Sequence, residues 1–245
     1  MLQITRSMLT HPTSRPALKD AAKYELVGVK AIVVHWTANT RRGANAMANR
    51  NYFNLGSRAA SAHFIVDDRT IVQCLPEYEV GYHCGDKPLG KYKAAGLATM
   101  QGTTGLTPNF FTIGVEMCVN EDADWSKTRK NTIELVAWLM AKHNRRTENL
   151  LRHWDVTGKL CPQMLLDAMA WQQFKKDVEN AMKWHTQLRY MVASVGLNVR
   201  AGAGVRFPIL VELRQGDPVV VFETRGEWWR IEGNGWVNSR YLISA

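Results

Sequence analysis

The pattern of strands and helices changes near residue 190, and this change divides the chain into two parts. Before it, apolar runs typical of buried strands alternate with segments of helical spacing, which is the pattern of an α/β fold. After it, short β-type runs such as ILVELRQGDPVVVFETRG follow one another with Gly and Pro between them, which indicates a small barrel. We therefore predict an α/β domain over residues 1–185, a linker over 186–193 and a small all-β domain over 194–245.

The first part contains four predicted strands and three predicted helices. The strands end at His35, cover His63–Val66 and Ile71–Leu75, and run from Phe111 to Val119. The helices cover residues 39–55, residues 126–143 and a segment that starts at Pro162 and runs towards Trp184. Residues 84–109 hold five glycines and two prolines, so they are predicted to form a long loop at the rim of a substrate groove.

The net charge of +9 is concentrated in the first part of the chain. Residues 1–189 carry 25 basic and 17 acidic side chains, whereas residues 190–245 carry six and five. A basic first part suits an anionic partner, either nucleic acid or a negatively charged cell wall. The sequence has no zinc-finger ligand pair, arginine-rich helix or RNA-binding aromatic signature, so the nucleic-acid alternative rests on charge alone and no specific nucleic acid is predicted as a partner.

The N-terminal sequence MLQITRSMLTHPTSRP lacks the apolar core of a signal peptide, and no run is long enough to span a bilayer. We therefore expect synthesis in the cytoplasm, no membrane insertion and a separate route of release for any action outside the cell. In such a protein cysteines are reduced by default. Cys74, Cys84 and Cys118 are predicted to be small buried hydrophobic residues, with a redox pair Cys74–Cys84 as the alternative.

A short segment, RHWDVTGKLCP, holds a histidine, a lysine and a cysteine in one predicted loop that ends at a helix. Imidazole and thiolate are preferred zinc ligands, so His153 and Cys161 are candidates for a metal site. Two ligands are too few, and the best third candidate is His35, at the end of a predicted buried strand. A His/His/Cys set leaves the fourth tetrahedral position to water, as in catalytic zinc sites.

A hydrolytic metal centre also needs a group that accepts a proton and a positive group that stabilises an oxyanion. Glu116 lies within the apolar strand TIGVEM, where burial would tune its proton affinity and suit it to proton transfer. The alternative for Glu116 is an ion pair with a structural arginine or a position at a strand edge. Lys159 lies two residues before Cys161 and could polarise a carbonyl in the same cavity, although a loop lysine by itself is usually solvated surface.

Four motifs in the first part resemble those of a known family. VVHWTAN, SAHFIVDDRTIVQCLPEYEVGYHCGD, IGVEMCVN and RHWDVTGKLCPQ, in this order and spacing, resemble the zinc-dependent N-acetylmuramoyl-L-alanine amidases of the amidase-2 type. That group includes phage endolysins and Bacillus-type autolysins and is related to peptidoglycan recognition proteins. The similarity covers roughly residues 25–180, and the C-terminal part resembles a bacterial SH3 (SH3b) cell-wall-binding module. The implied fold is a mixed central β-sheet flanked by helices, followed by a small SH3-like barrel.

The resemblance also implies roles for individual residues. It makes His35, His153 and Cys161 the ligands of one zinc ion per chain. Glu116 falls where many of these enzymes keep an acidic general base or acid, and Lys159 matches a basic residue that stabilises the tetrahedral intermediate.

The second motif departs from the family pattern at one position. Some relatives carry a catalytic tyrosine where this chain has Ala62, so Glu116 is expected to carry the proton transfer alone. The adjacent His63 is expected to pack rather than bind metal. His83 matches a histidine that commonly lines the glycan or peptide groove, and it is a candidate substrate-binding residue with plain loop surface as the alternative. Asp155 could orient His153 or cap a turn.

These observations predict a cell-wall lytic enzyme, a monomer that hydrolyses the amide between N-acetylmuramic acid and L-alanine in peptidoglycan. The C-terminal module would tether it to the wall. A phage endolysin released by a holin-type or lytic route fits the missing signal peptide. The main alternative is a non-catalytic peptidoglycan recognition protein, although those relatives replace the cysteine ligand and Cys161 is present here.

Overall fold

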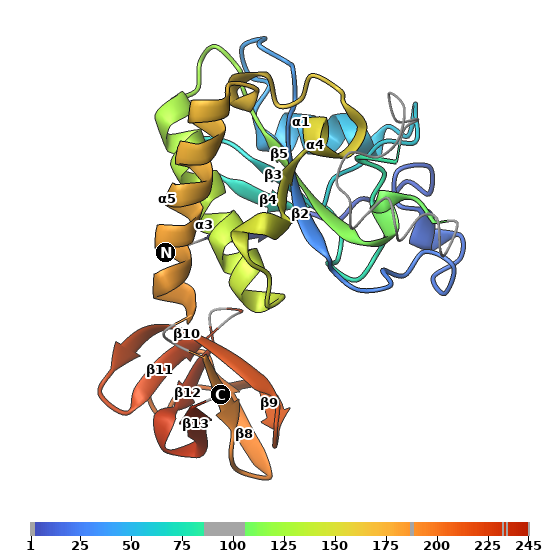
Figure 1. The fold of residues 1–245 in the computed structure, drawn as a ribbon. Helices are drawn as coiled ribbons and strands as arrows, with labels where there is room; N and C mark the ends of the chain where they lie inside the picture. Colours follow the sequence, from blue (N-terminus) through green and yellow to red (C-terminus); the bar gives the residue numbers. More distant parts are fainter. Residues whose placement is uncertain (1–2, 86–105, 187–188, 232, 234, 245) are drawn as a thin grey trace. The chain divides into compact units, whose positions relative to one another are not determined.

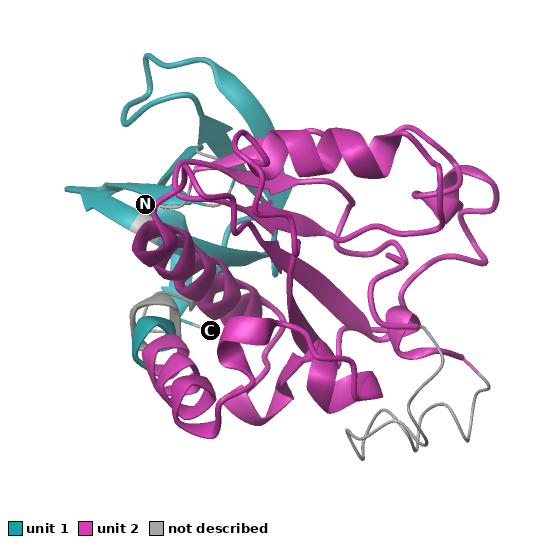
Figure 2. Cartoon of the chain, turned by 90° about the horizontal axis from the view of Figure 1, so that it is seen from above, with its two compact units in different colours: residues 1, 180–245 teal, residues 2–179 magenta. Residues whose placement is uncertain are grey.

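Figure 1 shows the fold of the protein as a computed structural model, which describes residues 3–85, 106–186, 189–231, 233 and 235–244. The chain divides into two compact units, one of residues 2–179 and one that takes in residues 180–245 (Figure 2). No helix in these described ranges is long and apolar enough to cross a lipid bilayer. Each unit is built on its own sheet.

The first unit contains a six-stranded mixed sheet with the order β1-β4-β3-β5-β2-β6. Its strands are β1 (Ile4–Arg6), β2 (Ala31–Trp36), β3 (Phe64–Val66), β4 (Ile71–Gln73), β5 (Thr112–Met117) and β6 (Leu150–Arg152). All neighbouring strands are parallel except β3 and β4, the predicted strand-turn-strand unit. The central strands β2 and β5 are apolar almost throughout because both faces of a largely parallel sheet are covered. The predicted mixed α/β fold is confirmed.

Among the described residues, four α-helices and four short 3-10 helices lie between these strands or follow the last of them. The α-helices are α1 (Ala46–Asn54), α3 (Trp125–Lys142), α4 (His153–Thr157) and α5 (Ala168–Thr186). The 3-10 helices are η1 (Pro16–Leu18), η2 (Pro108–Phe110), η3 (Thr147–Asn149) and η4 (Gln163–Leu165). The helix predicted over 126–143 is therefore confirmed as α3.

Two predicted helices begin later than their sequence patterns indicated. The helix predicted from residue 39 begins at Ala46, because the Asn45 side chain accepts a hydrogen bond from the Ala48 N–H and caps it there. The last helix begins at Ala168 and not at Pro162, since the Asp167 carboxylate accepts a hydrogen bond of 2.8 Å from the N–H of Ala170. Most of the predicted loop 84–109 lies outside the described residues.

The face of the sheet that carries α1 is established by one core cluster. Ala46 and Phe53 of α1 pack with Ile65 of β3, and α3 contacts the sheet at β2, β3 and β5. Ile65 pairs in register with Glu116, which pairs in turn with His35. Because paired residues of neighbouring strands point to the same face, Glu116 and His35 lie on the α1 face.

Cys74, Cys84 and Cys118 are buried and none of the three is in a disulfide, which agrees with the prediction of small core-forming side chains. The alternative pairing of Cys74 with Cys84 is not formed. Cys74 and Cys118 belong to the same core cluster as α1.

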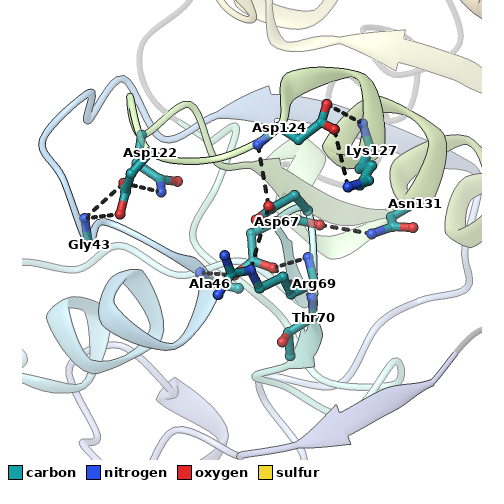
Figure 3. Close-up of polar contacts among 11 residues, drawn as sticks. Gly43, Ala46, Asp67, Arg69, Thr70, Asp122, Asp124, Lys127 and Asn131 are labelled. Atoms are coloured by element: carbon teal, nitrogen blue, oxygen red, sulfur yellow. Dashed lines mark hydrogen bonds and ion pairs between the residues drawn. The ribbon is translucent and has the colours of Figure 1, made fainter.

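A polar network around Asp67 holds the loop that leads into α1 (Figure 3). The buried carboxylate of Asp67, in the turn between β3 and β4, accepts a hydrogen bond of 2.8 Å from the Ala46 N–H at the start of α1. Asp122 accepts hydrogen bonds of 3.0 and 3.1 Å from the N–H of Gly43. Residues 37–45 join β2 to α1. These contacts therefore fix the segment that follows His35, the candidate metal ligand on β2.

The second unit contains an antiparallel seven-stranded sheet with the order β13-β7-β10-β11-β12-β8-β9. Its strands are β7 (Arg189–Val192), β8 (Gly196–Arg200), β9 (Ile209–Arg214), β10 (Pro218–Arg225), β11 (Trp228–Ile231), β12 (Trp236–Asn238) and β13 (Leu242–Ser244), with the 3-10 helix η6 at Ser239–Tyr241. A cluster of buried aliphatic side chains forms its core. The predicted all-β character is confirmed, and β7 falls within the range 186–193 that the sequence indicated as a linker.

Candidate metal centre and active site

The carboxyl ends of three adjacent parallel strands, β5, β2 and β6, meet at one edge of the first sheet. His35 near the end of β2 pairs in register with Glu116 of β5. Val34 pairs with Arg152, so the next residue, His153, follows β6 at the level of His35. Parallel pairing therefore brings together two histidines that are 118 positions apart in the chain.

The three predicted metal ligands, His35, His153 and Cys161, converge at this edge, and their ligand atoms all lie within 4.8 Å of one another. The Nδ1 atoms of the two histidines are 3.0 Å apart, and Cys161 Sγ is 3.7 Å from His35 Nδ1. Around a tetrahedral zinc ion two nitrogens would be separated by about 3.3 Å and a nitrogen and a sulfur by about 3.6 Å. The donor set and its spacing therefore fit a tetrahedral metal ion.

All three ligands are buried, and the surroundings of His35 favour the neutral form that a metal requires. The three residues are 1%, 2% and 5% exposed, in chain order. Burial, followed by the neighbouring rings of His153 and His83, lowers the pKa of His35 well below its usual value of 6.5. His35 is therefore a neutral imidazole that can offer a lone pair to a cation.

A short helix presents His153, where the sequence indicated a loop. α4 begins at His153, and the Asp155 carboxylate accepts a hydrogen bond of 2.8 Å from the Arg152 N–H and two more, of 2.7 and 3.0 Å, from the Arg152 guanidinium. Asp155 thus has the capping role, one of its two predicted alternatives. The carbonyl oxygen of Cys161 accepts a hydrogen bond of 2.9 Å from the Trp154 N–H. This contact holds Cys161 next to the first turn of α4, which begins at His153.

Glu116 is a carboxylate in an apolar strand, and its Oε2 atom is buried without a hydrogen-bond partner among the described residues. Burial raises the pKa of Glu116 from 4.5 to about 7, and the positive charge of Lys159 opposes this increase. Among the described residues no arginine pairs with this oxygen, and β5 lies inside the sheet between β3 and β2, so neither predicted alternative is found. A carboxyl group with a pKa near 7 is suited to exchange a proton near neutral pH.

A cleft of about 840 Å³ contains all of these groups. The exposed Lys159 lines it together with Glu116 and the three ligand residues. The volume lies within the range of about 300–1,000 Å³ typical of ligand sites. Tyr52 of α1 and Arg58, which follows this helix, also line the cleft.

His83 and His63 are both buried near this cleft but differ in their contacts. His83 lines the cleft, and its Nδ1 lies 3.1 Å from His35 Nε2. His63 is fixed by backbone groups: its Nδ1 accepts a hydrogen bond from the Gly114 N–H, and its Nε2 donates one to the Glu79 carbonyl oxygen. This agrees with the expected packing role of His63. The neighbouring Ala62 is fully buried and has no group for proton transfer.

Sequence reasoning missed Asn109, which is 5% exposed. Its Oδ1 accepts hydrogen bonds from the N–H of His83 at 3.2 Å and of Cys84 at 2.9 Å. An asparagine after a proline is typical of a loop or turn. Because Asn109 is 26 positions from His83, no local pattern indicates this contact.

The comparisons with known proteins agree with this geometry. A family model described as N-acetylmuramoyl-L-alanine amidase matches residues 25–164, and a model described as bacterial SH3 domain matches residues 195–243. N-acetylmuramoyl-L-alanine amidase CwlL of Bacillus licheniformis is 37% identical over 178 residues, which cover 69% of this chain and 44% of that protein. XlyA of Bacillus subtilis (strain 168) is 38% identical over 147 residues, which cover 60% of this chain and 43% of that protein. The chain thus spans less than half the length of these two relatives.

Solved structures show the same fold in the first unit. The catalytic domain of XlyA superposes with a TM-score of 0.59 and 34% identity, covering 72% of this chain and 99% of that chain. A mutant endolysin from Bacillus subtilis gives the same TM-score and identity, covering 73% of this chain and 99% of that chain. The chain belongs to the N-acetylmuramoyl-L-alanine amidase family and carries a bacterial SH3 domain in its C-terminal part.

Proposed function

We propose that the first unit hydrolyses the amide bond between N-acetylmuramic acid and the L-alanine of the peptidoglycan stem peptide, with one Zn²⁺ held by His35, His153 and Cys161. The main support is the buried His/His/Cys set in one cleft with Glu116, whose buried Oε2 has no hydrogen-bond partner among the described residues. Family membership and the amidases CwlL and XlyA support the choice of bond.

Zinc suits this ligand set because imidazole nitrogen and thiolate sulfur together select zinc over harder cations. A bound zinc ion would polarise the scissile carbonyl and lower the pKa of a water molecule. The chain would supply three ligands to the ion, and the cleft that these residues line would leave room for water and substrate.

Proton transfer is assigned to Glu116, whose pKa of about 7 suits a group that first accepts and later donates a proton. Glu116 takes the proton of the attacking water and delivers it to the leaving nitrogen of L-alanine. Lys159, on the same cleft, stabilises the negative charge that develops on the carbonyl oxygen. His83 also lines the cleft and is retained as a candidate contact for the glycan or peptide.

Product analysis tests the proposed bond. Purified Gram-positive peptidoglycan is digested with the full chain, with and without a zinc chelator, and the products are identified by mass spectrometry. We expect stem peptides with free L-alanine amino termini and unsubstituted muramic acid, only in the metal-loaded sample. New reducing sugar ends or cleavage within the peptide would show that the bond is wrong. Wall binding without any product would favour the recognition-protein alternative.

The likeness to the mutant endolysin from Bacillus subtilis supports a lytic role of the endolysin type for this chain. In such a role the peptidoglycan of a bacterial wall is the main partner. The concentration of positive charge in residues 1–189 suits an anionic wall polymer.

The SH3 domain is proposed to bind the wall and to raise the local concentration of the catalytic unit on an insoluble substrate. Deletion of residues 190–245 is expected to weaken co-sedimentation with whole walls by at least about tenfold. The same truncated protein should keep its rate on soluble muramyl peptides, which serves as the internal control for folding. Undiminished sedimentation of the truncated protein would contradict the tether.

A further inference from the structure

We propose that His83 is a positioning residue that keeps the proton of His35 on Nε2 and so leaves His35 Nδ1 bare for the metal ion. The inference rests on the metal proposed above for His35, His153 and Cys161, and it does not depend on the identity of the substrate. It assigns to His83 a function separate from any contact with glycan or peptide.

His35, His83 and Thr112 form a buried series of polar contacts that leads away from the metal centre. His35 Nε2 lies 3.1 Å from His83 Nδ1. On the other side of the His83 ring, Nε2 lies 3.3 Å from the carbonyl oxygen of Thr112 and 3.3 Å from its hydroxyl oxygen. The Thr112 hydroxyl in turn donates a hydrogen bond of 2.8 Å to the carbonyl oxygen of Pro108. His35, His83 and Thr112 are 1%, 8% and 0% exposed, so water does not compete freely for these contacts.

The contacts with Thr112 indicate which ring nitrogens of His83 and His35 carry hydrogen. A hydroxyl has one hydrogen, and that of Thr112 is directed at Pro108, so both Thr112 oxygens can only accept from His83. His83 Nε2 must therefore carry a hydrogen. In a neutral imidazole the other nitrogen is then an acceptor, and His83 Nδ1 accepts from His35 Nε2. His35 thus holds its proton on Nε2 and has a lone pair on Nδ1.

The unprotonated nitrogen of His35, Nδ1, is the one that faces the other two metal ligands. His35 Nδ1 is 3.0 Å from His153 Nδ1 and 3.7 Å from Cys161 Sγ. Histidine ligands generally donate their other N–H to a partner that fixes the tautomer and raises ligand basicity, and loss of that partner costs about 10- to 100-fold in metal affinity. His83 fills this position for His35, although such partners are more often carboxylates or backbone carbonyls.

Two features of the surrounding protein, the side chain of Asn109 and the absence of a side chain at Gly114, fix the position of His83. Asn109 Oδ1 accepts hydrogen bonds from the N–H of His83 and Cys84, which anchors the backbone. Gly114 of β5 leaves room for the ring, because a Cβ atom there would lie 2.5 Å from His83 Cγ and 2.8 Å from His83 Nδ1. Alanine at position 114 would thus displace the ring without removing any hydrogen-bonding group.

The test measures binding of Zn²⁺ alone to the full chain, by competition with a chromophoric chelator, in wild type, His83→Phe, His83→Asn and Gly114→Ala. We expect His83→Phe and Gly114→Ala to lose about 10- to 100-fold in Zn²⁺ affinity. His83→Asn should stay within about threefold of wild type, because its side-chain oxygen can accept from His35 Nε2 in place of the ring nitrogen. In metal-free wild type, ¹⁵N NMR of the imidazoles should show His35 protonated on Nε2, and His83→Phe should lose this signature.

His143→Phe serves as the matched control, since it removes a half-buried imidazole that pairs with Glu77 and does not line the cleft. It should bind Zn²⁺ as wild type does. Equal Zn²⁺ affinity in wild type and His83→Phe, with a raised KM as the only defect, would overturn the positioning role and leave a substrate contact. Failure of wild type to bind Zn²⁺ would overturn the proposed metal centre and this inference together. If the protein shows no amidase activity but His83→Phe still weakens Zn²⁺ binding, the positioning role of His83 is supported and the proposed reaction is contradicted.

Discussion

Replacement of Cys161 by alanine is expected to abolish peptidoglycan hydrolysis and to weaken Zn²⁺ binding by more than the roughly 10- to 100-fold typical of a lost supporting contact. The physical reason is that Cys161 supplies the only sulfur in the buried set of three ligand residues, and two histidines alone leave a zinc ion half-coordinated. The measurement is the metal content of the purified protein together with the Zn²⁺ dissociation constant.

Cys74→Ala is the matched control, because Cys74 is an equally buried thiol in the core beneath α1. It should lose some stability and keep both metal and activity. Wall binding should survive in Cys161→Ala, as it does not require the metal. An active, metal-loaded Cys161→Ala protein would show that the metal centre has been assigned to the wrong residues.

Replacement of Glu116 by glutamine or alanine is expected to leave Zn²⁺ binding intact and to lower kcat by about 10²- to 10⁴-fold, the usual contribution of a general base. Glu116 pairs with His35 in the sheet, yet it is not in the set of ligand atoms that converge. We therefore expect these variants to contain as much metal as wild type while their kcat is lowered. Near-normal turnover in Glu116→Ala would remove the residue from the mechanism.

The same substitution should also change how the stability of the metal-free protein depends on pH. The pKa of Glu116 is raised from 4.5 to about 7, so the folded protein keeps this proton over a range where the unfolded chain has lost it. Stability therefore falls as pH rises from 4.5 to about 7, by roughly 3 kcal/mol for this group.

In Glu116→Gln this loss is absent, so the variant should be more stable than wild type at pH 8 and differ less from it at pH 5. Urea unfolding at the two pH values, with a chelator present, measures the difference. A gap between the two proteins that does not change with pH would mean that Glu116 is not held in its protonated form by burial.

Local sequence patterns were sufficient for the two strands that carry His35 and Glu116, but not for β6 and α4, which carry His153. The apolar runs that end at His35 and enclose Glu116 predicted β2 and β5, because central strands of a largely parallel sheet bury both faces. The change of pattern near residue 190 predicted the second, all-β unit, since short strands with frequent turns leave a local signature. The starts of α1 and α5 were predicted several residues too early, because side-chain caps at Asn45 and Asp167 decide them.

The sequence by itself determined the chemical types available for a site: imidazoles, a thiol, a carboxylate in an apolar strand and a lysine near the thiol. Residue type and short-range spacing carry that information. Only the tertiary structure decided that His83 lies against His35 and that Asn109 holds its backbone. These contacts join residues 26 to 48 positions apart through the packing of β2, β5 and the segment at His83. Strand register, which is a property of the whole sheet, determines them, and no local sequence pattern records it.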